Sequence, residues 1–180
     1  SLLDRQTDEG GFYADDGDRP FFHASDEGLP IVALCRYLDV VEEGESPENG
    51  SNEHDGPADD EAPDDGPIDD DLAEAIADGL ARYWEWELDL TDDVVNPFGY
   101  ARQYAQALDE DEPAARFFFP HENESGYWWQ GENARLASLA AAAHASQRVL
   151  DDAEFAESLP AFARDQLAWI LGRNPYDTCM

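Results

Sequence analysis

The spacing of apolar residues predicts a mostly helical protein. The clearest stretch is 70–90, where acidic residues separate apolar positions that recur every three or four residues. This is the period of an α-helix with one buried face. We therefore expect a long amphipathic helix there. The positions on its apolar face are Leu72, Ala75, Ile76, Gly79, Leu80, Tyr83, Trp84 and Leu88.

Other segments fit the helical period less regularly. Residues 28–42 are apolar on nearly every side, which indicates a buried helix, with a central strand as the alternative. The alanine-rich stretch 131–144 and residues 159–171 predict two more helices. Gly172 followed by Pro175 fits the end of the last one.

A shorter helix is expected near residue 100. Strand-like patterns are limited to short extended pieces such as 115–119. We therefore predict an all-α fold, in which helical hairpins with long loops pack in a layer or ring. The face of the shorter helix would consist of Tyr100, Ala101, Tyr104, Ala105 and Leu108.

An acidic insertion separates the first two predicted helices. Residues 43–68 contain no large apolar side chain before Ile68, so their middle is expected to be disordered. Their carboxylates are suitable calcium ligands, but the Asp-x-Asp-x-Asp-Gly spacing of an EF-hand loop is absent. We predict no metal site and no cofactor.

The charge of the chain is its most unusual property. Ten arginines and no lysine stand against 43 acidic residues, which gives a formal net charge of −33. Molar salt would relieve the resulting repulsion, because it shortens the Debye length to roughly 3 Å. We interpret the acidity as adaptation to high salt, with a specific cationic partner as the alternative. Nucleic acid is excluded as a partner, since binding it needs clustered basic residues.

Cysteines and segment ends add little to this interpretation. Cys35 lies in an apolar helical run and is expected to be a buried thiol rather than half of a disulfide with Cys179. No apolar run is long enough to cross a membrane, and no signal peptide is visible. Ser1 and the final YDTCM look like cuts through a longer protein. Oligomeric state and compartment are therefore left unassigned, between a high-salt cytoplasm and the medium of a halophile.

Candidate chemistry lies in loops before the predicted helices. His23 and Asp26 stand in FFHASDEG at 21–28, and His121 opens HENESGYWWQGEN at 121–133. Binding residues concentrate on loops that a rigid scaffold positions. Simpler roles remain open, because aspartate often caps a helix N-terminus and a histidine can be a neutral hydrogen-bonding group.

Trp128 and Trp129 are adjacent in the second of these loops. Neighbours in an extended segment point to opposite faces, so the two indoles cannot easily both be buried. One indole facing a groove would offer a platform to the apolar face of a sugar ring; plain core residues are the alternative. Glu132 and Asn133 follow at the helix start, where the helix dipole alone favours a carboxylate.

Carboxylates beside aromatic residues suit glycoside hydrolysis. One carboxylic acid protonates the leaving oxygen, and another activates water or attacks carbon. Asp26, Glu122, Glu124 and Glu132 are of the right type. In a chain this acidic, however, a carboxylate in a loop carries little information.

Three stretches go further than composition and spacing: FFHASDEGLPIVALCRYL at 21–38, FFFPHENESGYWWQGENARLASLAAAA at 117–143 and ARDQLAWILGRNPYDTCM at 163–180. In this order, they resemble the later part of the catalytic domain of glycoside hydrolase family 9, especially its archaeal and bacterial glucanase-like members. The third is the most specific, because it is similar to the family's D-Q-L-x-x-[IV]-L-G-x-N-P block.

This resemblance implies an (α/α)6 toroid that hydrolyses β-linked glucan or a related oligosaccharide with inversion. It also implies an aspartate base from an early Asp-Ala-Gly-Asp block and a glutamate acid beyond the Leu-Gly-x-Asn-Pro block. The DDGD at 15–18 runs into a different sequence, and the glutamate would follow Met180. We therefore assign no catalytic residue and expect residues 1–180 to be an inactive part of one such domain.

The expected partner is an oligosaccharide or polysaccharide, with no nucleic acid and no membrane. A non-catalytic helical module that binds carbohydrate or protein is one alternative. Another is a different toroid enzyme, such as a polysaccharide lyase or sugar epimerase, with His23 or Tyr100 as its catalytic group. The residues assigned to hold sugar hydroxyls, stack on a ring or brace the loops are His23, Asp26, His121, Trp128, Trp129, Glu132 and Asn133.

Overall fold

The computed structural model describes residues 2–13, 27–44, 70–105, 112–118, 131–150 and 153–179. A short 3-10 helix, η1 (Leu3–Arg5), precedes four α-helices in this part of the chain. These are α1 (Leu29–Gly44), α2 (Asp70–Asp92), α3 (Glu132–Ser146) and α4 (Ala153–Ile170). Strands β1 (Gln103–Ala105) and β2 (Ala114–Arg116) pair antiparallel, with Tyr104 opposite Ala115.

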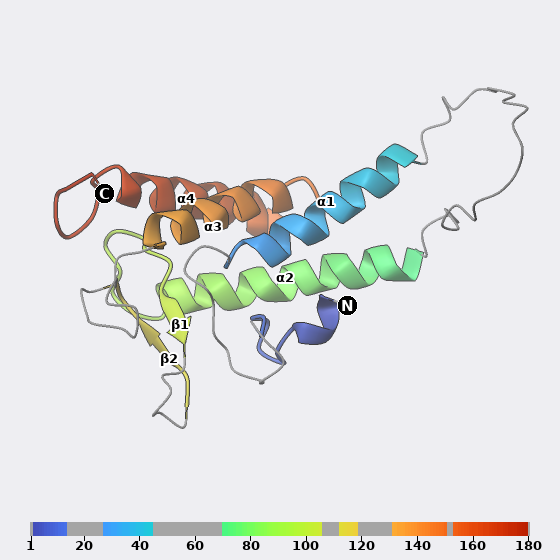
Figure 1. Cartoon of the computed structure of the whole chain (residues 1–180), viewed down its shortest axis with the longest axis horizontal. Coiled ribbons are helices and arrows are strands. Elements are labelled where there is room, and N and C mark those ends of the chain that lie inside the picture. The colour runs from blue at the N-terminus through green and yellow to red at the C-terminus, as the bar shows by residue number, and fades with distance from the viewer. Residues whose placement is uncertain are drawn as a thin grey trace, which may run out of the picture.

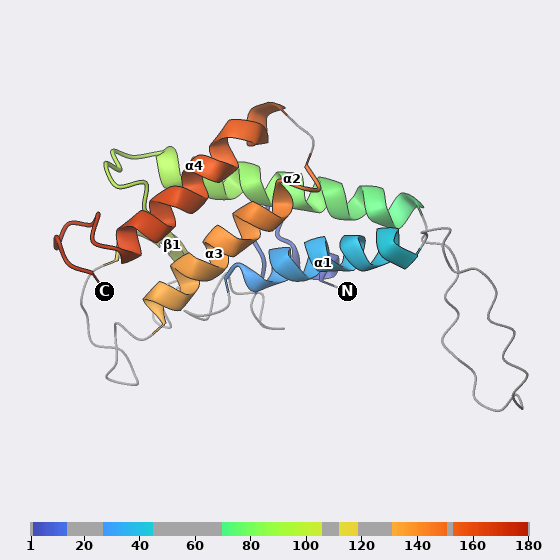
Figure 2. The same cartoon turned by 90° about the horizontal axis from the view of Figure 1, so that it is seen from above.

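Three of the helices form a layer, and α2 lies against one face of it (Figure 1). Within the layer, α3 lies between α1 and α4 (Figure 2). Helices α1 and α3 run in the same direction, whereas α2 and α4 return in the opposite direction. The starts of α1 and α3 therefore point toward the same end of the molecule as the last turns of α2 and α4. The β-hairpin lies at this end as well.

The two layers meet at an apolar core around Trp84 of α2. Its indole contacts the ring of Phe162 in α4 edge-on, with 5.4 Å between ring centroids. Its Nε1 donates a hydrogen bond to Ser146 Oγ of α3 over 2.8 Å. Both Trp84 and Ser146 are fully buried. A buried indole N–H needs such a partner, and the bond therefore fixes the position of α2 under α3 and α4.

The start of α1 is in direct contact with the middle of α3. The Gly28 N–H donates a hydrogen bond to Ser138 Oγ over 3.1 Å. A Cβ atom at residue 28 would lie 2.3 Å from the Ser138 backbone oxygen. Only glycine allows this approach, so the loop that leads into α1 is brought against α3.

Most of the predicted helices are confirmed. The stretches 28–42, 70–90 and 131–144 fall within or close to α1, α2 and α3. The prediction that α1 is buried all round was wrong, because Leu29, Tyr37 and Val40 are each about half exposed or more. The insertion expected at 43–68 begins inside the last turn of α1, and the rest of it lies outside the described residues.

The structure also tests the predictions made for the last helix and for the two cysteines. Helix α4 ends at Ile170, two residues before Gly172, whose φ of 113° is easy only for glycine. Leu171, which was expected on its apolar face, is 73% exposed. Cys35 is a free, buried thiol, as expected, and Cys179 is free and exposed.

The helix expected at 100–108 was wrong, and with it the purely α-helical fold class. Residues 103–105 form β1 instead. The tertiary structure supplies hydrogen bonds that a helix would otherwise make: Gln166 of α4 accepts the Ala101 N–H over 2.8 Å and donates to the Gly99 carbonyl over 2.7 Å. A fixed partner in α4 thus outweighs the helical spacing of the apolar residues.

Candidate functional site

Most of the residues predicted to bind sugar lie outside the described residues. These are His23, Asp26, His121, Trp128 and Trp129. The candidate carboxylates Glu122 and Glu124 and the DDGD at 15–18 also lie outside the described residues. Glu132 and Asn133 are described and form the first two positions of α3. They follow Gly131, whose φ of 92° turns the chain into the helix.

Glu132 is a buried anchor at the start of α3. Only 5% of the residue is exposed. Its carboxylate accepts hydrogen bonds from Tyr100 Oη over 2.7 Å and from Gln103 Nε2 over 2.7 Å, one on each oxygen. Arg135, one turn later in α3, donates a third over 3.0 Å. With these bonds in place, Glu132 braces Tyr100 and the first residue of β1 against α3. Asn133 is the more accessible of the pair.

Arg135 joins three segments at this end of the molecule. Its fully buried guanidinium pairs with Glu27, just before α1, and with Glu132. It also donates to the Ala101 carbonyl and lies 5.3 Å from the centroid of the Tyr100 ring. Burial raises the pKa of the Glu27 carboxyl, and Arg135 opposes this rise. Removing one member of such a buried group would leave a charge without its partner.

Tyr100 has no sign of a role as a base. It is 2% exposed, and burial raises the pKa of its phenol well above the ordinary value. The phenol therefore stays protonated at neutral pH and donates to Glu132. This removes support for the alternative in which Tyr100 abstracts a proton.

Two Asn-Pro turns of the same design lie at this end, one after α2 and one after α4. In the first, Asn96 Nδ2 donates to the carbonyls of Thr91 and Tyr100, each over 2.9 Å. In the second, Asn174 Nδ2 donates to the carbonyls of Trp169 and Thr178, each over 2.8 Å. The spacing is the same in both cases: five residues back to the end of the helix and four residues forward. Each asparagine thereby donates to a carbonyl in the last turn of its helix, where intrahelical N–H partners run out; the Trp169 carbonyl also accepts the Gly172 N–H.

The backbones of the two turns also match. A hydrogen bond of 3.2 Å links the fourth residue to the first in each, from the Gly99 N–H to the Asn96 carbonyl and from the Asp177 N–H to the Asn174 carbonyl. The fourth residue has a positive φ in both, 61° at Gly99 and 48° at Asp177. Glycine and aspartate tolerate this conformation better than most residues. The two helix ends thus carry equivalent turns.

An aromatic hollow of about 220 Å³ lies between these turns. Pro97 and Pro175, the prolines of the two turns, both line it, together with Val95 and Asn96. Among the described residues that line it, none carries a formal charge, although the chain as a whole is strongly acidic. The aromatic lining residues are Phe98, Tyr100, Phe117, Phe118 and Trp169.

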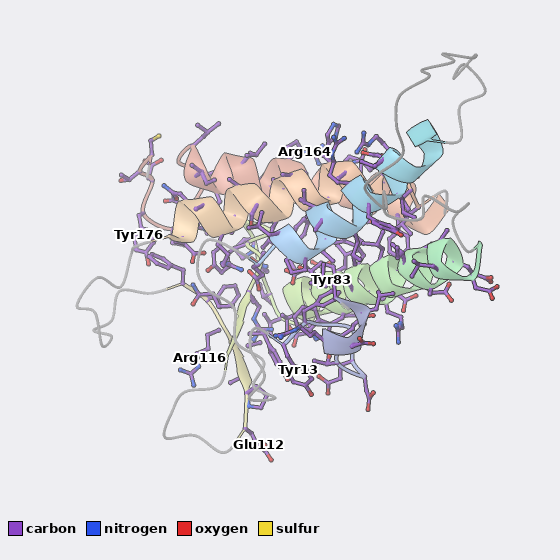
Figure 3. All side chains as sticks on the ribbon, turned by 45° about the vertical axis from the view of Figure 1, so that its right-hand side comes forward. Tyr13, Tyr83, Glu112, Arg116, Arg164 and Tyr176 are labelled. Atoms are coloured by element: carbon purple, nitrogen blue, oxygen red, sulfur yellow. The ribbon has the colours of Figure 1, made fainter. Side chains whose placement is uncertain are left out.

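The aromatic rings of the hollow hold one another in place. Trp169 is buried and contacts Tyr100, with 5.2 Å between centroids, and Phe118, with 5.7 Å. Phe118 in turn contacts Tyr176, which lies in the loop after α4 (Figure 3). Phe117 is 42% exposed and lies 5.5 Å from the guanidinium of Arg102. The hollow therefore has a rigid floor and one exposed ring at its side.

Sequence reasoning missed most of this site. It assigned no role to Asn96, Asn174 or Arg135, and it placed Tyr100 on a helix. The one available signal was the repeated Asn-Pro-aromatic sequence at 96–98 and 174–176. Its meaning depends on the carbonyls that each asparagine side chain reaches, which the sequence does not specify.

No protein-family model and no curated protein sequence matches this chain. Among the described residues, no cluster of histidine, cysteine, aspartate and glutamate has the arrangement of a metal site. Within the same residues, no helix is both long and apolar enough to cross a lipid bilayer. The candidate site thus rests on its own geometry.

Proposed function

We propose that this chain forms part of a glycoside hydrolase catalytic domain and holds a ring of an uncharged, β-linked glucan in the aromatic hollow between its two Asn-Pro turns. The observation that carries the proposal is the lining of this hollow: the described residues that line it include five aromatic ones and no charged one, in a chain of net charge −33. An aromatic face suits the C–H face of a pyranose ring, and a neutral sugar is not repelled by the acidic surface.

The arrangement of the helices supports the toroidal part of the proposal. In a ring of helical hairpins, first helices lie side by side in parallel and second helices return in the opposite direction. Helices α1 and α3 have the first relation, and α2 and α4 run back. In addition, the two hairpins end in the same way, because matching turns follow α2 and α4. An (α/α)6 toroid is the ring that this repetition favours.

Exposed apolar stripes on the two outer helices of the layer are consistent with further hairpins. On α1, Leu29, Tyr37 and Val40 lie along one side at intervals that suit a helix. On α4, Leu167 is 47% exposed, and Leu171 follows it at 73%. Exposed apolar side chains that gather on one side of a helix can mark an interface. In a toroid, the neighbouring hairpins on either side would cover these stripes.

Within this proposal the chain binds substrate and does not perform the chemistry. Hydrolysis needs an acid and a base or nucleophile at separations of about 5–9.5 Å around the glycosidic bond. Glu132, the only described member of the predicted carboxylate set, is occupied by three donors. Trp128 or Trp129 would provide a second stacking surface, and His23, Asp26, His121 and Asn133 would contact hydroxyls.

Binding of soluble β-glucan oligosaccharides in molar salt tests the role of the hollow. Phe117→Ala should weaken binding by about tenfold, because an aromatic contact of about 1.5 kcal/mol corresponds to that factor. Tyr37→Ala removes an equally exposed aromatic ring from α1, far from the hollow in sequence, and should leave the affinity unchanged. Equal affinities for the two variants would exclude the hollow as the sugar site.

Alanine substitution of Trp128 and Trp129, one at a time, tests the predicted stacking loop. We expect weaker binding for one of the two variants, since adjacent residues of an extended loop face opposite sides. Hydrolysis of β-glucans by the full-length protein in molar salt tests the enzymatic class. Binding without turnover on any glycan would favour the non-catalytic carbohydrate-binding module instead.

A further inference from the structure

Helix α2 carries a column of buried polar side chains that have no partner. Tyr83, Glu87 and Thr91 are four residues apart and therefore lie on one face of the helix. That face points toward the other helices, as the position of Tyr83 shows (Figure 3). Among the described residues, no hydrogen-bond partner is present for Tyr83 Oη, for Thr91 Oγ1 or for either carboxyl oxygen of Glu87. Glu87 is fully buried.

The charges around Glu87 do not balance it. Glu27, before α1, and Arg135, in α3, are the charged groups that act on it, and Tyr83 is the titratable neighbour on α2 itself. Arg135 is already paired with Glu27 and Glu132. Among the described residues, one guanidinium thus stands against three buried carboxyl groups, those of Glu27, Glu87 and Glu132. Burying an ionised carboxylate that lacks its own partner is far more costly than burying the neutral acid.

The direction of the titration agrees with this geometry. Burial raises the pKa of Glu87 well above its ordinary value and Glu27 raises it further, whereas Arg135 and the neighbouring Thr91 hydroxyl lower it only in part. Tyr83 cannot neutralise a charge on Glu87, because a phenol is neutral when protonated and negative when ionised. Burial and the neighbouring Glu87 raise the pKa of this phenol well above its ordinary value.

We propose that Glu87 is a neutral carboxylic acid in the folded protein and acts as a proton-operated latch for the packing of α2 against the starts of α1 and α3. With its proton, the side chain fits between the helices. Without it, the carboxylate competes with Glu27 for Arg135. Because Glu27 adjoins Gly28, which contacts Ser138 of α3, loss of the Arg135 pair loosens the start of α1.

The sign of the pH effect follows from the raised pKa. The folded protein binds a proton at Glu87 that the unfolded chain releases above about pH 4.3, the ordinary value for glutamate. The free energy of unfolding therefore falls as the pH rises from about 4.3 toward the pKa of Glu87 in the folded state. The folding equilibrium constant of the wild type should fall by up to tenfold per pH unit relative to that of Glu87→Gln, which mimics the neutral acid.

Urea unfolding in molar salt from pH 5 to pH 9 measures this ratio. The matched control is Glu85→Gln, which makes the same substitution at an exposed position two residues away on α2. Its ratio to the wild type should not change steeply with pH. A constant ratio between the wild type and Glu87→Gln would overturn the proposal, since it would mean that Glu87 titrates alike in both states.

A spectroscopic signature separates the latch from a merely structural role. The folded wild type at neutral pH should show the infrared carbonyl band of a protonated carboxylic acid, and Glu87→Gln should lack it. Should Glu87→Gln not fold, carbon-13 NMR of glutamate side chains in the wild type gives the same information. A carboxyl resonance that stays in the protonated position at neutral pH supports the latch, and its absence overturns it.

Discussion

The turns after α2 and α4 are built from the same local contacts, yet they occupy different surroundings. Asn96 and Asn174 each bond the end of their helix and the residue four positions on. The first turn is also held from outside, because Gln166 of α4 bonds the Gly99 carbonyl and the Ala101 N–H. Pro175, Tyr176, Asp177 and Thr178 of the second turn are exposed.

The fourth position of each turn shows what this difference means. Both residues have a positive φ, but the first is glycine and the second is aspartate. A Cβ atom at Gly99 would lie 2.6 Å from Asp165 Oδ2 and 2.9 Å from its Cβ. The turn itself therefore accepts a side chain at this position, and only the contact with α4 demands glycine at 99.

Substitution of this fourth residue by alanine should give the largest difference in stability loss between the two turns. Gly99→Ala is expected to lower the free energy of unfolding by about 2–4 kcal/mol, from the positive φ and the overlap with Asp165. Asp177→Ala should lower it by about 1 kcal/mol, since only the backbone conformation is affected. Urea unfolding followed by tryptophan fluorescence in molar salt measures both. Equal losses would mean that the packing against α4 is unimportant.

Removing the outside support should affect the first turn in a similar way. Gln166→Leu leaves the Ala101 N–H and the Gly99 carbonyl without partners, and we expect a loss of about 2–3 kcal/mol. The control is Leu167→Gln, at a half-exposed position next along α4, with an expected change within about 0.5 kcal/mol. The same unfolding measurement applies. If the stability of Gln166→Leu were close to that of the control, the first turn would be stabilised by its own local contacts and not by α4.

The smallest effect is expected in the second turn, where it should remain local. Asn174→Ala removes the bonds to Trp169 and Thr178 and the acceptor of the Tyr176 N–H, for a loss of about 1–2 kcal/mol. Hydrogen exchange at the Tyr176 amide should become faster, while the amides in the middle of α2 keep their protection. If protection fell throughout α2 as well, the second turn would be part of the global fold and not a separately held loop.

The sequence predicted the helices because each buries a face with a regular period. Ile76, Leu80 and Trp84 of α2 are spaced as expected and are buried as expected. It failed at residues 100–105, where the apolar spacing suited a helix but Gln166 and the pairing with β2 fixed an extended chain. Periodicity reports local compatibility only, and a partner more than 60 residues away is not visible in it.

The candidate site was less predictable than the fold. Glu132 was correctly placed at a helix start, but its hydrogen bonds with Tyr100 and Gln103 come from a segment that was expected to be helical. The aromatic hollow combines rings from the Asn96 turn and the residue after it, from the two residues that follow β2, and from α4. Their types could be read from the sequence, whereas their convergence could not.

By itself, the sequence determined the helical segments, the acidic surface and the chemistry available in each loop. These depend on short-range spacing and on composition, which a single chain displays directly. The tertiary structure decided which of these groups meet. It alone paired Arg135 with Glu27, placed two Asn-Pro turns around one hollow and left Glu87 buried without a hydrogen-bond partner in the described part of the chain. The reason is physical: the burial and pairing of a polar group depend on distant segments, and these set its charge and its role.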